Sequence, residues 1–113
     1  MCGIFSLLNY EEIDQVISDS FNKGASRGPE NSTLNIYDKI ITGFHRLAIN
    51  GLNSESNQPF YINNIVLMCN GEIYNYTELA HDNDINLTTD SDCEIIIHLY
   101  LLHGLEYTLT ILD

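Results

Sequence analysis

The clearest shortage in this sequence of 113 residues is positive charge. Four lysines and arginines stand against 16 aspartates and glutamates, for a formal net charge of −12. Proteins that bind nucleic acid or anionic membrane draw their affinity from lysine and arginine contacts with phosphates, so this composition argues against both functions. The carboxylates are scattered along the chain, which is typical of a solvated surface and not of an acidic interaction tail.

Long apolar runs and cysteines are scarce too. No stretch approaches the ~20 consecutive apolar residues that a membrane helix needs. Segment 1–10 lacks the positive charge and the apolar length of a signal peptide. Three cysteines are an odd number and too few for a disulfide scaffold, which favours a reducing compartment and predicts a cytoplasmic location. The length and the hydrophobic content of 44% are those of one folding domain.

What the sequence does hold is a series of short apolar segments separated by polar ones. Apolar stretches bounded by turn residues predict strands, here at 2–8, 33–37, 39–48 and 65–69. The second and third strands are expected to form a hairpin that turns at Asp38. Segments 24–32, 50–59 and 82–90 are polar and predict loops. Strands that come first, with helices between and after them, indicate an α+β fold with a largely antiparallel sheet.

Helices are expected at 10–22, 76–80 and 92–103. The first is predicted to begin at a capping box and to end near Gly24; the box would be Asn9 with Glu12, and the apolar stripe would be Ile13, Val16, Ile17 and Phe21. The 92–103 helix is apolar around almost its whole circumference and is closed by Gly104, so we expect it to be buried on most sides. The sequence then ends at Asp113 within apolar residues.

Cys2 is the first residue that could carry chemistry. Removal of Met1 ahead of this small residue would leave a thiol and a free α-amine on one carbon. An α-amine has an ordinary pKa of about 7.7–8.0, low enough for it to act as a base at physiological pH. A nucleophile activated by its own terminal amine is a known catalytic arrangement. The alternative is that Met1, Cys2 and Gly3 are an ordinary chain start.

Asn70, Gly71 and Glu72 follow the last predicted strand. A turn there can aim a side-chain amide and a backbone N–H at one point, as an oxyanion hole requires. The alternative is a simple hairpin turn, because Asn-Gly is the strongest short signal for one.

Arg46 is one of two arginines and lies in a predicted strand, where its guanidinium could hold a carboxylate with two parallel hydrogen bonds. A structural salt bridge is equally plausible in so acidic a chain. Arg27, before Gly28 and Pro29, is expected to fix its loop. Asp92 lies at the start of a predicted helix, where capping is its expected role on local grounds.

No metal site is expected. Asp82, Asp84 and Asn86 have the spacing of a calcium loop, but the required turn glycine and final glutamate are absent. Cys93, His98 and His103 do not share the helix face of a zinc pair. Cys69 and Cys93 lie in apolar runs and are expected to be buried thiols.

Five segments in order and in register resemble one family. They are Met-Cys-Gly-Ile-Phe at 1–5, Arg-Gly-Pro-Glu at 27–30, His-Arg-Leu-Ala-Ile at 45–49, Asn-Gly-Glu-Ile-Tyr-Asn at 70–75 and Ser-Asp-Cys-Glu at 91–94. Together they resemble the glutaminase domain of class II glutamine amidotransferases, which are N-terminal-nucleophile hydrolases, and most closely the glutamine-hydrolysing asparagine synthetase type.

The resemblance implies hydrolysis of glutamine to glutamate and ammonia. It assigns attack on the side-chain amide to Cys2, and the oxyanion to Asn70 and the Gly71 backbone. It assigns the substrate α-carboxylate to Arg46 and the α-ammonium to Asp92. The rest of the implied pocket consists of Gly71, Glu72 and backbone groups at Ile49 and Asn50.

The resemblance also sets expectations about extent. It implies that 1–113 is the N-terminal part of the amidotransferase domain, an αββα sandwich incomplete at its C-terminus, with no synthetase domain present. ATP and magnesium would belong to that absent domain, and this domain would need no cofactor. The expected partners are L-glutamine and an ammonia-accepting synthetase domain or chain, with self-association as a further possibility. Two family histidines are replaced, by Ser26 and Phe44. A truncated, non-catalytic remnant or interaction module is the alternative function.

Overall fold

The computed structural model describes residues 1–113, which divide into two compact units. Unit 1 comprises Met1–Ala48, Asn57–Pro59 and Met68–Asn70, and unit 2 comprises Ile49–Ser56, Phe60–Leu67 and Gly71–Asp113. Each unit contains helix and antiparallel strand. The predicted α+β class with antiparallel sheets is therefore confirmed.

Unit 1 is built on a three-stranded antiparallel sheet in the order β1-β3-β2. The strands are β1 (Gly3–Leu8), β2 (Asn31–Tyr37) and β3 (Ile40–Arg46). The predicted hairpin at Asp38 is confirmed: Asp38 has a φ of 55°, in the left-handed region that aspartate tolerates, and Tyr37 pairs with Ile40. β2 begins earlier than expected, at Asn31, after a short 3₁₀ turn at Ala25–Arg27.

The first helix begins later than the sequence predicted. α1 spans Gln15–Asn22, and its N-cap is Asp14, whose carboxylate accepts the Ile17 N–H at 2.8 Å. The predicted capping box is wrong, because Asn9 has a φ of 66° whereas a capping residue needs extended backbone. Asp14 has that backbone, with φ −86° and ψ 177°.

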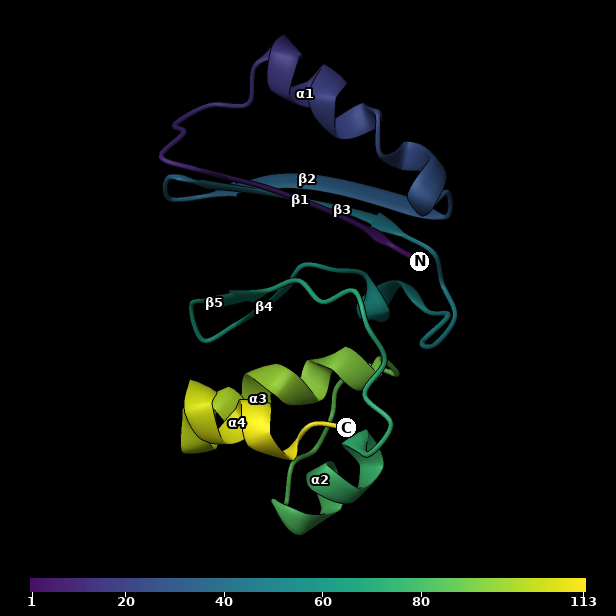
Figure 1. The fold of residues 1–113 in the computed structure, drawn as a ribbon, viewed down its shortest axis with the longest axis vertical. Helices are drawn as coiled ribbons and strands as arrows, with labels where there is room; N and C mark the ends of the chain where they lie inside the picture. The colour runs from purple at the N-terminus through teal and green to yellow at the C-terminus, as the bar shows by residue number, and fades with distance from the viewer. The chain divides into compact units, whose positions relative to one another are not determined.

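α1 covers one face of the unit 1 sheet (Figure 1). Phe21 is buried against β3, where a Cβ on Gly43 would come within 2.7 Å of the Phe21 ring. Phe5 of β1 meets the same ring edge-on, with 5.9 Å between ring centroids. Ile17 is buried as predicted, whereas Val16 is exposed, because it lies on the solvent side of this shorter helix.

Unit 2 contains a hairpin that the sequence reading missed. β4 (Phe60–Ile62) pairs with β5 (Ile65–Leu67) through a two-residue turn at Asn63 and Asn64. Their φ values of 50° and 62° suit the turn that follows the twist of the strands. The strand predicted at 65–69 is thus shorter. Asn70 and Gly71 lie beyond it without positive φ, so the hairpin-turn alternative for them is wrong.

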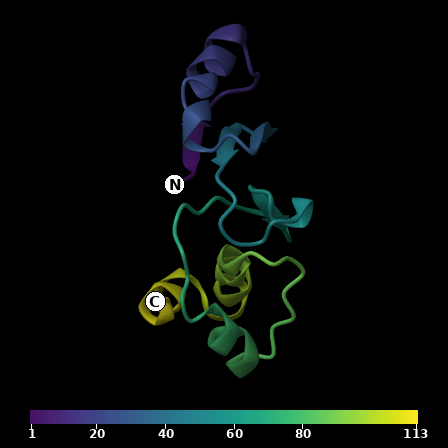
Figure 2. The ribbon, with the colours of Figure 1, turned by 90° about the vertical axis from the view of Figure 1, so that its right-hand side faces the viewer.

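Unit 2 also contains three α-helices, which pack together (Figure 2). They are α2 (Tyr76–Asp82), α3 (Ile95–His103) and α4 (Leu105–Ile111). Ile73, Ile95 and Leu99 make the buried core between them. The helices predicted at 76–80 and 92–103 are therefore confirmed, although 92–94 form a 3₁₀ turn ahead of α3.

Burial of α3 is confined to part of its surface. Ile95, Ile97 and Leu99 are buried, whereas the side chains at 100–102 are substantially exposed. The expectation of burial on most sides is therefore wrong for the last turn. Gly104, at φ 81°, separates α3 from α4, a helix that the sequence reading did not anticipate.

Candidate functional site

Cys2 lies at the start of β1, beside the end of β3. Gly3 pairs with His45 in the antiparallel register, so the next pair along places Cys2 opposite Arg46. The Cys2 Sγ accepts the Leu47 N–H at 3.3 Å and lies 3.5 Å from the Leu47 carbonyl oxygen. These two contacts with the Leu47 backbone fix the position of the sulfur at the end of β3.

Arg27 holds the other end of the Cys2 residue. Its Nε donates to the Cys2 carbonyl oxygen at 3.1 Å, across 25 residues of sequence. Gly28 brings the loop close enough, because a Cβ there would lie 2.2 Å from the His45 carbonyl oxygen. Only glycine fits so close an approach, so the Arg-Gly-Pro segment serves to hold Arg27 against β1 and β3. The expected loop-fixing role of Arg27 extends to the first residues of the chain.

A pocket of about 340 Å³ opens beside Cys2, within unit 1. Cys2, Arg27, His45 and Asn70 are among its lining residues. His45 is buried and stacks on the Phe21 ring with 4.0 Å between ring centroids. Its Nε2 lies 2.8 Å from the Phe21 carbonyl oxygen, and because a carbonyl only accepts, Nε2 carries the hydrogen. His45 forms one wall of the pocket and is held in place by Phe21 of α1.

Arg46 ends β3 and is buried, with its Nη1 donating to Asn57 Oδ1 at 2.6 Å. An amide oxygen orients a guanidinium without cancelling its charge. A guanidinium held in this way suits recognition of an anion such as a carboxylate.

Asn70, the predicted oxyanion donor, follows a fixed piece of backbone. The N–H of Cys69 donates to Gln58 Oε1 at 2.6 Å, and Gln58 is itself buried. The Gln58 carbonyl in turn accepts the Thr33 hydroxyl of β2 at 2.6 Å. The Gln58 side chain therefore fixes the chain immediately before Asn70, and the Gln58 carbonyl makes a separate contact with β2.

Asp92 lies in unit 2, in the 3₁₀ turn that precedes α3. The residue at the N-cap is Ser91, so the local capping role expected of Asp92 is wrong. Asp92 is buried, and its Oδ2 accepts the Ile73 N–H at 2.6 Å. The carboxylate therefore joins this turn to the chain that follows Gly71 and Glu72.

The other predicted pocket residues of unit 2 are more exposed. Asn50 Nδ2 donates to Glu72 Oε1 at 3.3 Å. The Ile49 side chain is 70% exposed. The Gly71 carbonyl lies 3.7 Å from the Cys93 sulfur, and Cys93 is buried as expected, whereas Cys69 is only partly buried.

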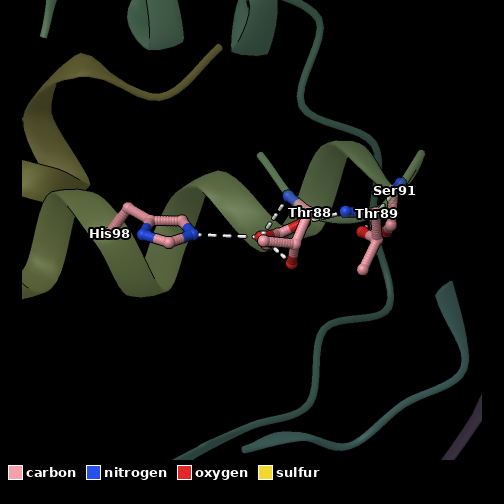
Figure 3. A network of polar contacts seen from close by, with 5 residues as sticks. Thr88, Thr89, Ser91 and His98 are labelled. Atoms are coloured by element: carbon pink, nitrogen blue, oxygen red, sulfur yellow. Dashed lines mark hydrogen bonds and ion pairs between the residues drawn. The ribbon is translucent and has the colours of Figure 1, made fainter. Parts of the chain in front are cut away.

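Glu94, in the same 3₁₀ turn, is fully buried in unit 2 and was not singled out from the sequence. Its carboxylate accepts the N–H groups of Thr88 and Thr89 at 2.9 and 2.7 Å, the Thr88 hydroxyl at 2.8 Å and His98 Nε2 at 3.0 Å. Figure 3 shows Thr88 and Thr89 at one side of this network and His98 of α3 at the other. The network pins the 88–91 segment to the start of α3.

These contacts also fix the charge of Glu94. Burial opposes ionisation and raises its pKa, but the hydrogen bonds from Thr88, His98 and Thr89 outweigh burial and lower the pKa from 4.5 to about 2. The carboxylate therefore stays charged over the whole physiological range of pH.

The structure places the predicted site residues in two groups. Unit 1 brings together Cys2 and Asn70 around one pocket and sets Arg46 on the strand beside Cys2. The five remaining residues lie in unit 2, where hydrogen bonds join Asn50 to Glu72 and Asp92 to Ile73; these five are Ile49, Asn50, Gly71, Glu72 and Asp92.

Four supporting residues escaped the sequence reading: His45, Asn57, Gln58 and Glu94. No local pattern signals the contacts of Asn57 and Gln58, which join residues 11 to 25 positions apart. Glu94 does carry a signal in the sequence, because it belongs to the Ser-Asp-Cys-Glu segment at 91–94.

Two further features concern metal-binding clusters and membrane-spanning helices. The structure contains no group of three or more histidine, cysteine, aspartate or glutamate side chains that could hold a metal ion. No helix is both long enough and apolar enough to cross a membrane.

The arrangement suits attack on an amide by a thiol. The Cys2 thiol lies beside a backbone N–H, Arg46 is buried on the neighbouring strand, and Asn70 lines the same pocket as Cys2. Residues 1–113 match the family described as the glutamine amidotransferase domain, and the chain belongs to that family.

Three relatives illustrate the match, and all carry the name asparagine synthetase [glutamine-hydrolyzing]. A probable one from Acanthamoeba polyphaga mimivirus is 38% identical over 121 residues, covering 100% of this chain and 22% of the relative. The Bos taurus protein is 37% identical over 119 residues, covering 100% and 21%. The Bacillus subtilis protein, whose name ends in the numeral 2, is 35% identical over 116 residues, covering 95% and 15%. The chain thus spans about a fifth or less of the length of these relatives.

Proposed function

We propose that this chain hydrolyses the side-chain amide of glutamine, with Cys2 as the nucleophile. The observation that carries the proposal is the placement of the Cys2 sulfur, 3.3 Å from the Leu47 N–H in a family member whose second residue is cysteine. Removal of Met1 frees the Cys2 α-amine, which takes the thiol proton as the sulfur attacks the amide carbon. The negative charge that develops on the amide oxygen is stabilised by Asn70 Nδ2–H and Gly71 N–H.

The same amine then completes the chemistry. It returns the proton to the leaving nitrogen as the carbon–nitrogen bond breaks, which releases ammonia and leaves a thioester on Cys2. A water molecule, deprotonated by the amine, attacks the thioester and releases glutamate and the free thiol. Atoms balance as glutamine plus water giving glutamate plus ammonia.

Recognition of the amino-acid end uses opposite charges. Arg46 binds the α-carboxylate through its guanidinium. Asp92 binds the α-ammonium, and Gly71 and Glu72 lie nearby. Backbone groups at Ile49 and Asn50 complete the substrate contacts that we propose. This assignment is supported by the burial of both Arg46 and Asp92, since water competes less with a buried charge for its ligand.

The wider context is also part of the proposal. Residues 1–113 are the N-terminal part of an αββα sandwich of the N-terminal-nucleophile hydrolases, acting in the cytoplasm. The ammonia passes to a synthetase domain or partner chain that makes asparagine, and ATP and magnesium serve that synthetase and not this domain. The names of the relatives support the link to asparagine synthesis.

The proposal is tested by an assay of glutamine-dependent ammonia release. The sample is the full natural polypeptide, purified from its own cells. We expect ammonia and glutamate in equal amounts, loss of both in Cys2→Ala, and retention of both in Cys69→Ala. Ammonia release that survives in Cys2→Ala would contradict the proposed nucleophile. A folded wild-type protein without any release would instead favour a non-catalytic interaction module, the alternative to which the exposed apolar residues of α3 and α4 point.

A further inference from the structure

Asn57 and Gln58 form a short polar segment that reaches three parts of unit 1. Residues Asn57–Pro59 belong to unit 1, although the residues on both sides of them belong to unit 2. Asn57 Oδ1 accepts from Arg46 Nη1, and Gln58 accepts through both its side chain, from Cys69 N–H, and its carbonyl, from Thr33 Oγ1. All three donor–acceptor distances are 2.6 Å.

Two of these contacts end at the proposed machinery, and the third does not. Arg46 is the proposed carboxylate-binding residue, and Cys69 directly precedes the proposed oxyanion donor Asn70. Thr33 lies within β2 and has no proposed role in the reaction. The segment therefore offers a comparison between contacts of the same length with different targets.

We propose that Asn57 and Gln58 are positioning residues, Asn57 for substrate binding by Arg46 and Gln58 for the oxyanion contact made by Asn70. The inference rests on the proposed function and assigns separate parts of it to two neighbouring side chains.

Asn57 acts on binding through the orientation of a long side chain. An arginine side chain loses rotamer entropy when it is fixed. The Asn57 oxygen holds the guanidinium before substrate arrives, so that less of this entropy is lost on binding. Because the α-carboxylate is unchanged by the reaction, this contact is equally strong in the ground and transition states and governs KM.

Gln58 acts on the chemical step through the backbone. Its buried Oε1 fixes the Cys69 N–H and so the path of the chain into Asn70. An oxyanion donor is effective only within about 2.7–3.1 Å of the developing charge, and a displacement of about 1 Å can cost about a hundredfold in rate. Loss of this contact is expected to lower kcat with little change in KM.

Steady-state glutaminase kinetics on the polypeptide as the cell makes it separate the two roles. Asn57→Asp adds a carboxylate that competes with substrate for Arg46, and we expect KM to rise about tenfold or more with kcat within about twofold. Gln58→Met removes the acceptor, and we expect kcat to fall about tenfold or more with KM within about threefold. Gln58→Glu keeps an acceptor oxygen and should restore most of kcat. Gln58→Asn, which retracts the acceptor by one methylene, replaces the methionine variant if that variant does not fold.

The matched control is Thr33→Val, which deletes the third contact. We expect it to lower the urea concentration at the midpoint of unfolding while kcat and KM stay at wild-type values. Hydrogen exchange gives a readout independent of activity: the Cys69 amide should exchange faster in Gln58→Met than in Thr33→Val.

The outcomes separate this inference from the proposed function. An inert wild-type protein would overturn both. An active wild-type protein in which both variants change KM and kcat together, or in which Thr33→Val changes them equally, would overturn the positioning roles alone. The split between KM and kcat, with rescue by Gln58→Glu, supports them.

Discussion

Cys2 can serve as its own base only when its α-amine is free, because an amide nitrogen bonded to Met1 does not accept a proton. The first requirement of the mechanism is therefore a free α-amine on Cys2. The structure adds a second feature at this scale, since the Leu47 N–H points at the sulfur and Arg27 holds the adjacent carbonyl. Both contacts leave the amine available.

We predict that the mature protein begins at Cys2. Intact-mass measurement of protein purified from its own cells should show the loss of one methionine. A protein that retains Met1 and still releases ammonia from glutamine would exclude the α-amine as the base.

Arg46→Lys tests the amino-acid end of the pocket. Lysine keeps the charge but loses the planar fork that binds a carboxylate with two hydrogen bonds. We expect kcat/KM for glutamine to fall roughly 10- to 150-fold, which corresponds to about 1.5–3 kcal/mol, the range for a hydrogen bond to a charged group. Arg27→Lys makes the same chemical change at an arginine that has no proposed contact with the α-carboxylate of glutamine. An unchanged kcat/KM in Arg46→Lys would remove Arg46 from the site.

At the scale of elements, the turn before α3 depends on one buried carboxylate. Glu94 fixes the 88–91 segment, while Asp92 two residues before it holds the chain near Gly71 through Ile73. A buried charge with this many donors stabilises the fold only while it remains ionised. The element is therefore sensitive both to substitution and to strong acid.

We expect Glu94→Gln to lower the free energy of unfolding at neutral pH by about 2–3 kcal/mol, because a second acceptor oxygen is replaced by a donor amide. The exposed Glu78→Gln on α2 makes the same chemical change and should shift stability by less than about 0.5 kcal/mol. Urea unfolding of the three proteins measures both. Equal effects at the two positions would contradict the role of the network.

The pH dependence has a defined sign. A carboxylate whose pKa is lower in the folded state contributes stability that is fully present above its unfolded pKa. For Glu94 that contribution should be lost as pH falls from about 4.5 towards about 2. The stability difference between wild type and Glu94→Gln should accordingly shrink over this interval. A difference that is constant from neutral pH to about pH 2 would contradict the lowered pKa.

Elements set by local patterns were the ones that the sequence predicted well. The hairpin at Asp38 and the helix closed by Gly104 follow from turn and cap residues. The start of α1 was wrong, because Asn9 and Asp14 both resemble caps and only the backbone distinguishes them. Contacts such as Arg46 with Asn57 join distant positions and leave no local signal.

At the scale of the whole molecule, two opposing properties decide how copies of the chain meet. The formal net charge of −12 makes them repel one another. Several large apolar side chains of α3 and α4 are exposed and favour association; they are Tyr100, Leu101, Leu102, Leu105, Tyr107 and Leu109. Leu105 and Leu109 lie one turn apart on α4 and so share a face.

We therefore predict that a polypeptide of residues 1–113 self-associates, and more strongly as salt screens the repulsion. Analytical ultracentrifugation of wild type and a Leu105→Gln, Leu109→Gln variant measures this, with Leu52→Gln as the exposed control outside these helices. Association should weaken in the double variant alone. A monodisperse wild-type monomer at every salt concentration would contradict the prediction.

The central claim, that Cys2 is an activated nucleophile in a glutamine pocket, is tested most directly by covalent labelling. The probe is a glutamine analogue that carries a chloromethyl ketone in place of the side-chain amide, and peptide mass mapping locates the adduct. The account predicts that Cys2 is modified well before Cys69 and Cys93, and that glutamine slows the reaction, because thiolate character and access decide reactivity. Equal modification of the three cysteines, or modification of Cys2 only after denaturation, would contradict it.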